Sequence, residues 1–433
     1  MFAAKGRLVL AIVFLFIYVP FLVNHGLRAA DRRNVDLPSF YYATDAVFNE
    51  GLSPYAERGR QALQAELGQT VFPYLYPPPS LLLLAPFSWC SYDGLKGWVL
   101  AANHLCVLAL IYLLLFRIFA VALPGAPPSD PTKEGREQAF LRWLTLPLLV
   151  LYTLQFHPLV VTLGHGQINL FVLVLICLFW LALRSRASAW VIGLPLAGAI
   201  LLKTYPVLFL PLLLIRRKFK VAAYTTGYLA LLVLLSLVVL PAKTWSDWLS
   251  LVLPTGGYGQ EPYHLFSPAM PWNQSLNGFT ARLFLHPNYA LSLNPGLARV
   301  IPYIAAAAIL GTVAWLALRL TRDRETRYVN DELVVVLLSI FLVAPLSWEH
   351  HLVFVLPAAL LAIIHIVTGR ASLPESFSVL VAIGLLAWPM PYLFEIQGQG
   401  LLNLFVSLKF FAVVGLWVYF VRRLLRKAVP ARA

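Results

Sequence analysis

Long apolar runs separated by short polar or basic stretches make up most of this chain. Many runs approach the ~20 residues that a helix needs to cross the hydrocarbon core of a membrane. They lack the alternation that marks a membrane β-strand, and a backbone in lipid must satisfy its own hydrogen bonds, so they predict helices. We expect an all-α polytopic membrane protein with about 12 transmembrane helices. The expected spans are 8–24, 78–93, 97–119, 142–160, 166–184, 189–215, 221–241, 299–319, 332–346, 351–369, 378–395 and 402–421.

The composition favours the same class of protein. The 433 residues are 60% hydrophobic and only 12% charged, and the mean hydropathy is +0.76. A soluble domain of this length could not bury so much apolar surface. The formal net charge of +14 would suggest nucleic-acid binding in a soluble protein. Here the cations gather at the ends of apolar runs, so we expect no nucleic-acid partner.

Those basic clusters also predict the orientation of the chain, because loops rich in Lys and Arg stay in the cytoplasm. The clusters are 216–220, 319–327 and the tail 422–433, together with Lys5 and Arg7 near the start. Both termini are therefore expected on the cytoplasmic face of the cell's inner (plasma) membrane. Basic clusters beside a membrane also attract anionic headgroups, so membrane lipids are expected partners.

Two long segments, 25–77 and 242–298, remain on the external side of what we expect to be a single domain, 1–433. Both are rich in aromatic residues, Pro and Gly. Amphipathic pieces such as 246–253 suggest short helices lying on the membrane surface. Loops of this length are uncommon unless they carry binding or catalysis, so the functional site is expected there.

The first external segment contains acidic residues and clustered tyrosines. Asp36 and Asp45 lie beyond the first apolar run, with Tyr41 and Tyr42 between them. Most loop carboxylates are simply solvated. Asp36, however, follows several arginines and precedes an aromatic run suited to contacts with a sugar or with the membrane interface. It is the leading candidate for a general base.

Polar residues also interrupt the apolar runs. His165, Gln167 and Asn169 lie at the entrance to one run, where hydrogen bonding between helices is as good an interpretation as substrate binding.

Lys203 is a sharper signal, because it lies in the middle of the run 189–215. A cation at that depth costs about 2.5–3.5 kcal/mol, so we expect an internal anion to compensate it.

Two more polar groups belong to the external side. Asn273, Gln274 and Arg282 lie in the second loop, either as an ordinary turn or as a platform for a headgroup. Trp348, Glu349, His350 and His351 lie at the boundary of a later span. Adjacent helical residues diverge by roughly 100°, so the two histidines fit donors to a phosphate or a sugar better than a metal site.

In this order, these pieces resemble the polyprenyl-phosphate-dependent integral membrane glycosyltransferases of the C-type (GT-C) fold. Within that group the chain is similar to glycosyltransferase family 87, the alpha-1,2-mannosyltransferase-like enzymes. The resemblance covers about four fifths of the chain. It is carried by Asp36 with 40–42 and 51–55, by 76–78, 166–169 and 203–206, by 273–275 with Arg282, and by 347–351.

The resemblance implies transfer of mannose, or another hexose or pentose, from a polyprenyl-phosphate donor to a lipid or glycan hydroxyl outside the cytoplasm. An inverting transfer needs a base on the acceptor hydroxyl, a role carried over to Asp36. Candidates for binding the donor's phosphate and sugar are Lys203, Tyr205, Arg282, His350 and His351. Supporting polar residues are Tyr41, Tyr42, Asp45, His165, Gln167, Asn169, Asn273, Gln274, Trp348 and Glu349. No cofactor is expected, and a metal is not expected to be obligatory.

Two alternatives stay open. A lipid-linked-glycan flippase would also have about a dozen helices and a buried lysine, although such transporters often show repeats, and none is visible here. A glycan polymerase or ligase with a diphosphate-linked donor would need more external cations, a role open to Arg28, Arg32, Arg33 and Arg282.

Overall fold

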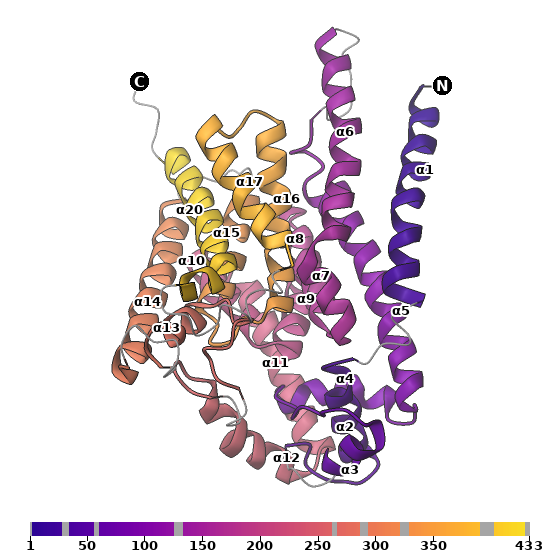
Figure 1. Ribbon diagram of the computed structural model, residues 1–433, viewed down its shortest axis with the longest axis vertical. Coiled ribbons are helices and arrows are strands. Elements are labelled where there is room, and N and C mark those ends of the chain that lie inside the picture. Colours follow the sequence, from indigo (N-terminus) through magenta and orange to yellow (C-terminus); the bar gives the residue numbers. More distant parts are fainter. Residues whose placement is uncertain are drawn as a thin grey trace.

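The computed structural model describes residues 2–27, 34–55, 60–124, 133–261, 266–285, 293–320, 329–389 and 402–428. Every element assigned within these ranges is a helix. Figure 1 shows both chain termini at one end of a tall helical bundle, whereas short helices gather at the opposite end. The all-helical membrane architecture expected from the apolar runs is therefore confirmed.

The longer helices run along the bundle. In the first half they are α1 (Phe2–Leu22), α5 (Tyr92–Ile111), α6 (Lys133–Gln155), α7 (His157–His165), α8 (Asn169–Arg184), α9 (Ala189–Leu202), α10 (Phe209–Ile215) and α11 (Phe219–Val239). In the second half they are α14 (Pro295–Leu320), α15 (Val329–Val343), α16 (Leu356–Val367), α17 (Leu373–Ala387) and α20 (Leu408–Ala428). Two π-helical turns, η1 (Val23–Leu27) and η4 (Tyr112–Ile118), continue α1 and α5.

The centre of the bundle is formed by helices that are apolar on every side. All thirteen residues from Asp331 to Val343 of α15 are buried, and so are Leu356 to His365 of α16. A helix buried all round belongs in the interior rather than at a lipid-facing edge. α20 packs on α15 and α17, while α9 packs between α8 and α11. At Gly193 a side chain would meet the backbone nitrogen of Thr225 at 3.0 Å, so this glycine allows the close approach of α9 and α11.

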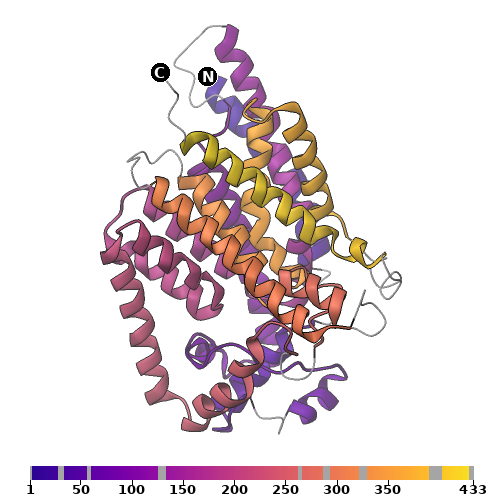
Figure 2. The same cartoon turned by 90° about the vertical axis from the view of Figure 1, so that its left-hand side faces the viewer.

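The remaining helices are short and connect those of the bundle along the chain. The segment 25–77 carries α2 (Leu37–Phe48) and α3 (Arg60–Leu67), and η2 (Pro78–Ser80), α4 (Leu81–Leu84) and η3 (Ala85–Phe87) follow it. Later ones are η5 (Tyr205–Leu208), α12 (Ala242–Asp247), η6 (Trp248–Val252), η7 (Leu253–Gly256), α13 (Leu276–Phe284), η10 (Glu349–Val355) and α19 (Asn403–Val406). α2, α3 and α12 lie at the end of the molecule away from the termini (Figure 1), and Figure 2 shows α11 leading down to that end. Both long loops thus carry short helices, as the sequence predicts.

Three expected spans require correction, and proline explains each. The segment 78–93 is not a spanning helix, because its helical part ends at Phe87 and contains Pro86. The span 142–160 breaks after Gln155 with a bend of 44°, just before Pro158. The span 189–215 breaks at Lys203, which is extended, and resumes with Pro206 in the next turn. Proline lacks a backbone donor and clashes with the preceding turn, so helices end or bend beside it.

The number of spans stays a prediction. Within the described part of the chain, four helices are long and apolar enough to cross a membrane, or up to five if the bent α6–α7 pair counts as one. Several expected features lie outside the described residues: 390–395 of the span 378–395, 321–327 of a basic cluster, and Arg28, Arg32 and Arg33.

Candidate active site

Asp36 is held against the end of α7 by the backbone. Its N–H donates to the carbonyl of His165 (3.0 Å). It occupies the position just before α2, yet its side chain makes no capping hydrogen bond there, so the carboxylate is free to point elsewhere. Gly166 makes this contact possible, because its φ of +68° suits glycine and a Cβ there would lie 2.8 Å from the Cβ of Leu37.

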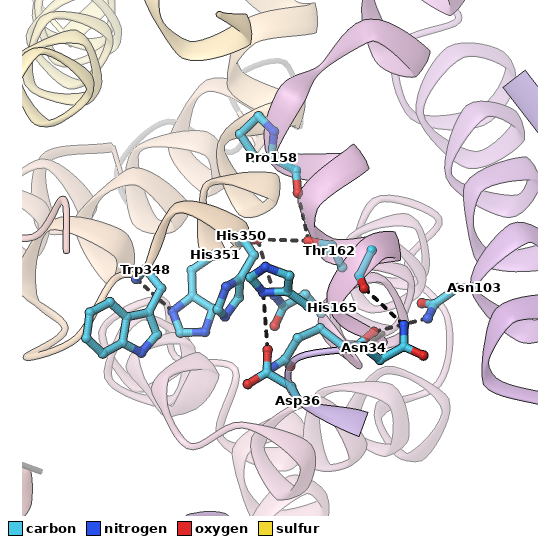
Figure 3. Close-up of polar contacts among 12 residues, drawn as sticks. Asn34, Asp36, Asn103, Pro158, Thr162, His165, Trp348, His350 and His351 are labelled. Carbon is cyan, nitrogen blue, oxygen red and sulfur yellow. Dashed lines mark hydrogen bonds and ion pairs between the residues drawn. The ribbon is translucent and has the colours of Figure 1, made fainter. Parts of the chain in front are cut away.

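The Asp36 carboxylate faces two histidines (Figure 3). Oδ2 of Asp36 lies 3.3 Å from Nδ1 of His165, and the ring of His165 meets that of His350 edge to face at 5.2 Å. Burial raises the pKa of Asp36, but the contact with His165 and the charges of His350 and His165 outweigh it and place the pKa below the usual 3.8. Asp36 is therefore ionised at neutral pH and able to accept a proton.

The histidine segment η10 is anchored by neighbouring helices. The hydroxyl of Thr162 and the side-chain amide of Asn169 both donate to the carbonyl of His350, at 3.0 and 3.2 Å. The backbone N–H of Trp348 donates to Nδ1 of His351 (3.2 Å). These bonds hold both imidazoles in place, with ring centroids 4.4 Å apart.

Lys203 occupies the break between α9 and η5. Only 5% of it is exposed, and its Nζ lies 2.8 Å from Nε2 of His351. The same ammonium lies over the rings of Tyr76 and Tyr205, at 5.6 and 5.8 Å from their centroids. Tyr76 in turn donates to Oε1 of Gln167 (3.1 Å). Aromatic faces and a helix C-terminus stabilise this cation, and no carboxylate among the described residues forms an ion pair with it.

Unpaired polar atoms concentrate around this cluster. Among the described residues, twelve buried side-chain polar atoms lack a hydrogen-bond partner. Five of the twelve surround the site: Oδ1 of Asn34, Asn103 and Asn169, Nε2 of His350 and the hydroxyl of Tyr205. Two more, Oδ2 of Asp36 and Nδ1 of His165, face each other at 3.3 Å. Buried polar groups are nearly always paired with protein or water, so such a concentration indicates a place for a polar ligand.

Three of the residues expected to bind the donor or support it lie in a different network. Arg282 is 1% exposed, and its guanidinium donates to Ser407 Oγ and to the carbonyls of Met270 and Asn273. Burial lowers the pKa of Arg282 to about 9, so it stays charged at neutral pH. The amide of Gln274 donates to the carbonyl of Val406 (2.8 Å). In the structure, this network connects the loop 242–298 to the segment just before α20.

Asn273 belongs to that network too. Its Oδ1 accepts from the backbone N–H of Ser347 (3.0 Å) and from the hydroxyl of Ser275 (2.9 Å). Its amide donates to the carbonyl of Pro268 (3.0 Å). These bonds connect the loop to the segment that precedes the histidines.

The other expected residues flank the site. Glu349 accepts hydrogen bonds from His157 (3.0 Å) and from Lys409, a side chain only 1% exposed. Trp348 stacks beside Trp272 with ring centroids 6.1 Å apart.

On α2, the tyrosines and the second aspartate make local contacts. Tyr42 packs in a small apolar cluster with Val71, and the ring of Tyr41 meets that of Tyr92 edge to face. Asp45 accepts a hydrogen bond from Asn49 (2.7 Å), one turn further along α2.

Several residues of the site were not picked out as candidates from the sequence. Tyr76 was noted only within a motif, although it supplies a face to Lys203. His157 and Lys409 hold Glu349, and Asn34 and Asn103 contribute two of the unpaired oxygens. Lys409 carried a usable signal, because it is a cation within the predicted span 402–421.

A metal ion is the one cofactor for which the described residues offer ligands. Asp36, His165 and His350 each present one ligand atom, and these atoms lie within 4.8 Å of one another. One carboxylate and two imidazoles suit a transition metal such as zinc. His351 does not belong to this group, because it faces Lys203. The expectation that no metal is obligatory stays a prediction.

The chain matches the model of glycosyltransferase family 87 over residues 74–345, more than half of its length. The chain belongs to glycosyltransferase family 87. The matched region includes Tyr76, His165 and Lys203, whereas Asp36 lies before it and His350 after it.

Three curated proteins are similar to this family 87 chain. A "polyprenol-phosphate-mannose-dependent alpha-(1-2)-phosphatidylinositol mannoside mannosyltransferase" of Mycobacterium tuberculosis is 27% identical over 66% of the chain and 61% of that protein. The protein of the same description from Mycolicibacterium smegmatis is 29% identical over 66% and 60%. A "phosphatidylinositol pentamannoside mannosyltransferase" of M. tuberculosis, also polyprenol-phosphate-mannose-dependent, is 27% identical over 66% and 61%. The chain thus spans about three fifths of the length of these relatives.

Proposed function

We propose that this chain transfers mannose, or a related sugar, from a polyprenyl-phosphate donor to a hydroxyl of a glycolipid or glycan, with inversion at the anomeric carbon. One observation carries the proposal: an ionised carboxylate with no capping role, Asp36, lies in a cluster of unpaired polar atoms that includes a buried cation, Lys203. The names of the similar mycobacterial proteins, which specify this donor and a phosphatidylinositol mannoside acceptor, support the assignment.

The step needs one base and one stabilised leaving group. Asp36 takes the proton of the acceptor hydroxyl while that oxygen bonds to the anomeric carbon of the donor. The bond between that carbon and the phosphate oxygen breaks, and its electron pair leaves with the polyprenyl phosphate. Lys203, positioned by its contact with His351, donates hydrogen bonds to the phosphate, and His165 holds the carboxylate of Asp36 in place.

The supply of cations favours a monophosphate donor over a diphosphate. Within the described residues, Lys203 is the cation that the site contains, because all four hydrogen bonds of Arg282 go to neutral oxygens elsewhere. A polyprenyl diphosphate carries more negative charge and would need a second cation or a metal. A polymerase or ligase with a diphosphate donor is therefore the second candidate, and a requirement for metal would favour it.

The donor assignment is tested with purified protein in detergent. Polyprenyl-phosphate mannose, polyprenyl-diphosphate sugars and nucleotide sugars are offered in parallel, and release of the lipid phosphate is measured. We expect turnover with the monophosphate donor, unchanged by EDTA. Turnover with a nucleotide sugar alone would refute the donor assignment. Loss in EDTA with recovery in Zn²⁺ or Mn²⁺ would instead make Asp36, His165 and His350 metal ligands.

The base is tested with a matched pair of variants. Asp36→Asn should retain donor binding and lose about 10²–10⁴-fold in rate, the usual cost of removing a general base. Asp45→Asn changes a carboxylate on the same helix that contacts Asn49, and it should transfer at nearly the wild-type rate. An Asp36→Asn protein that keeps more than about a tenth of wild-type turnover would mean that another group is the base.

We further propose that the site opens on the external face of the inner (plasma) membrane. Both termini lie at the opposite end of the bundle, and their basic residues favour the cytoplasm. In a background with Cys90 replaced by serine, cysteines at the exposed positions Glu50 and Ser250 should react with an impermeant thiol reagent from outside intact cells. Labelling of these positions only after the membrane is opened would reverse the proposed orientation.

The flippase alternative makes a different topological prediction. A transporter must present its polar site to both faces in turn, so a cysteine at Lys203 would be reachable from either side. In the glycosyltransferase it should be reachable from the outside alone.

A further inference from the structure

A small pocket lies beside the loop that carries Asp36, lined by residues on either side of it in the sequence. Asn34, Asn103 and Lys96 line it together with apolar residues that include Leu37, Leu100 and Leu163. Its volume is about 10 Å³, which is just enough for one water molecule or one hydroxyl group. Figure 3 shows Asn34 and Asn103 on one side of His165 and His351 on the other.

Two buried amide oxygens in this pocket have no partner. Asn34 is 8% exposed and Asn103 is 1% exposed, and the Oδ1 atom of each lacks a hydrogen bond among the described residues. The hydrogen bonds of the two side-chain nitrogens fix the orientation of each amide. Nδ2 of Asn34 donates to the carbonyl of Gly164 (2.9 Å), and Nδ2 of Asn103 donates to the carbonyl of Gln167 (3.2 Å). A flipped amide would place two oxygens against each other, so both Oδ1 atoms stay available as acceptors.

The two sides of Asp36 therefore differ in chemistry. On one side, Lys203 and His351 present nitrogen groups suited to a phosphate. On the other side, apart from the half-buried Lys96, the polar groups that lack a partner are neutral amide oxygens, which accept hydrogen bonds and cannot donate to an anion. A ligand that brings hydroxyl donors would satisfy Asn34 and Asn103. Asn34 and Leu37 line the pocket and flank Asp36 in the sequence, so such a ligand would lie close to the base.

We propose that this pocket is a subsite for the sugar acceptor. One hydroxyl of the acceptor's terminal sugar enters the pocket and donates to Asn34 or Asn103, and this contact presents a neighbouring hydroxyl to Asp36. The half-buried Lys96 lies where further oxygens of the headgroup would pass. The assignment rests on the proposed function, since it names the side from which that reaction receives its acceptor.

The test uses octyl α-mannopyranoside as the acceptor probe and polyprenyl-phosphate mannose as the donor. Asn103→Leu removes the acceptor oxygen with little change in size. We expect kcat/KM for the acceptor to fall by about tenfold or more, the cost of losing one buried hydrogen bond, while the KM of the donor stays within about twofold. One deoxy analogue of the probe should show the same loss with wild-type protein and no further loss with Asn103→Leu.

Asn277→Leu is the matched control. Asn277 is also 1% exposed and donates to a backbone carbonyl, but its Oδ1 already accepts from the N–H of Gly259 (2.9 Å). This variant should lower the thermal stability and leave the acceptor kcat/KM of the folded protein unchanged. Equal acceptor kinetics in wild type and Asn103→Leu would mean that the pocket holds only a structural water, and the proposal would be wrong.

A binding measurement separates this proposal from the proposed function. If wild-type protein transfers sugar to no acceptor, saturation-transfer NMR with octyl α-mannopyranoside still tests the pocket. Binding to wild type that is lost in Asn103→Leu supports the subsite even though the donor assignment has failed. No binding to wild type, or equal binding to both proteins, overturns the subsite.

Discussion

Two of the buried cations, Arg282 and Lys203, should respond in opposite ways to replacement by methionine. Arg282→Met leaves two buried acceptors without the donor they have now, the carbonyl of Asn273 and Ser407 Oγ, whereas the carbonyl of Met270 keeps the backbone N–H of Asn273. Each orphaned acceptor costs about 1–3 kcal/mol, and removal of a buried charge with no carboxylate partner offsets part of that. We expect a net loss of about 2–4 kcal/mol in the free energy of unfolding.

Lys203→Met should instead act on the ligand. Its ammonium contacts His351 and two aromatic faces, so its loss orphans little of the protein. A charge-assisted hydrogen bond to a phosphate contributes about 1.5–3 kcal/mol, which corresponds to roughly 10- to 100-fold in the Kd of polyprenyl phosphate. We expect the apo protein to unfold at the same temperature as wild type or higher.

Both variants are measured by thermal unfolding in detergent and by titration with polyprenyl phosphate. A normal melting temperature with weakened lipid-phosphate binding in Arg282→Met would show that Arg282 binds the donor after all. Unchanged binding in Lys203→Met would remove Lys203 from the donor site.

Three further predictions follow from individual contacts. Lys409→Met should lower the free energy of unfolding by about 3 kcal/mol, because it leaves the Glu349 carboxylate with His157 as its one partner. In a double-mutant cycle, adding Glu349→Gln should restore part of that stability. Additive losses in the two variants would contradict the ion pair. The pKa of Asp36 in the folded protein lies below its ordinary value of 3.8. The ionised carboxylate therefore stabilises the fold above pH 3.8, and this stabilisation is lost as the pH falls through the pKa of the folded state. The stability difference between wild type and Asp36→Asn, from chemical denaturation, should therefore be constant from about pH 8 to 5 and change only below about pH 4; a change near pH 6 would point to a histidine instead. Gly166→Ala should reduce transfer at least tenfold, because the added Cβ would collide with Leu37 and displace the Asp36 loop. Gly369 also has a positive φ but open space around it, so Gly369→Ala should lower stability and leave transfer unchanged. Equal activities of the two variants would show that the loop tolerates the displacement.

The general architecture could be predicted because it depends on the length of apolar runs, and the bilayer sets that length. Lys203 could be predicted for the related reason that a cation inside such a run needs compensation. The breaks beside Pro158 and Pro206 were harder to predict, because bundle helices can contain proline without ending: α9 itself contains Pro195. Whether proline ends a helix depends on partners that are distant in the sequence.

Contacts between distant segments explain why the site in the structure differs from the expected one. Arg282 was expected to bind the phosphate because it is a cation in the loop 242–298, and nothing near it in sequence shows that Ser407 lies 2.9 Å away. Asn34 and Asn103 were not among the candidates, because their importance depends on an unpaired oxygen in a shared pocket. An unsatisfied hydrogen-bonding group is a property of the folded protein and cannot be read from one residue's neighbours.

A pattern in the sequence nevertheless connects the residues of the site. Asp36, His165 and Lys203 all lie where a helix starts, ends or breaks, and His350 lies in a 3-10 turn. Inside a continuous helix the backbone groups bond to one another and side chains diverge around the axis, so several polar groups converge most easily at helix ends. In a membrane bundle such irregular backbone is tolerated only where protein or a water-filled cavity surrounds it. In this chain, a polar residue close to a proline within an apolar region therefore indicates a site better than polarity alone does. The proline ends or bends the helix, and at the break a polar side chain can point toward side chains from other helices.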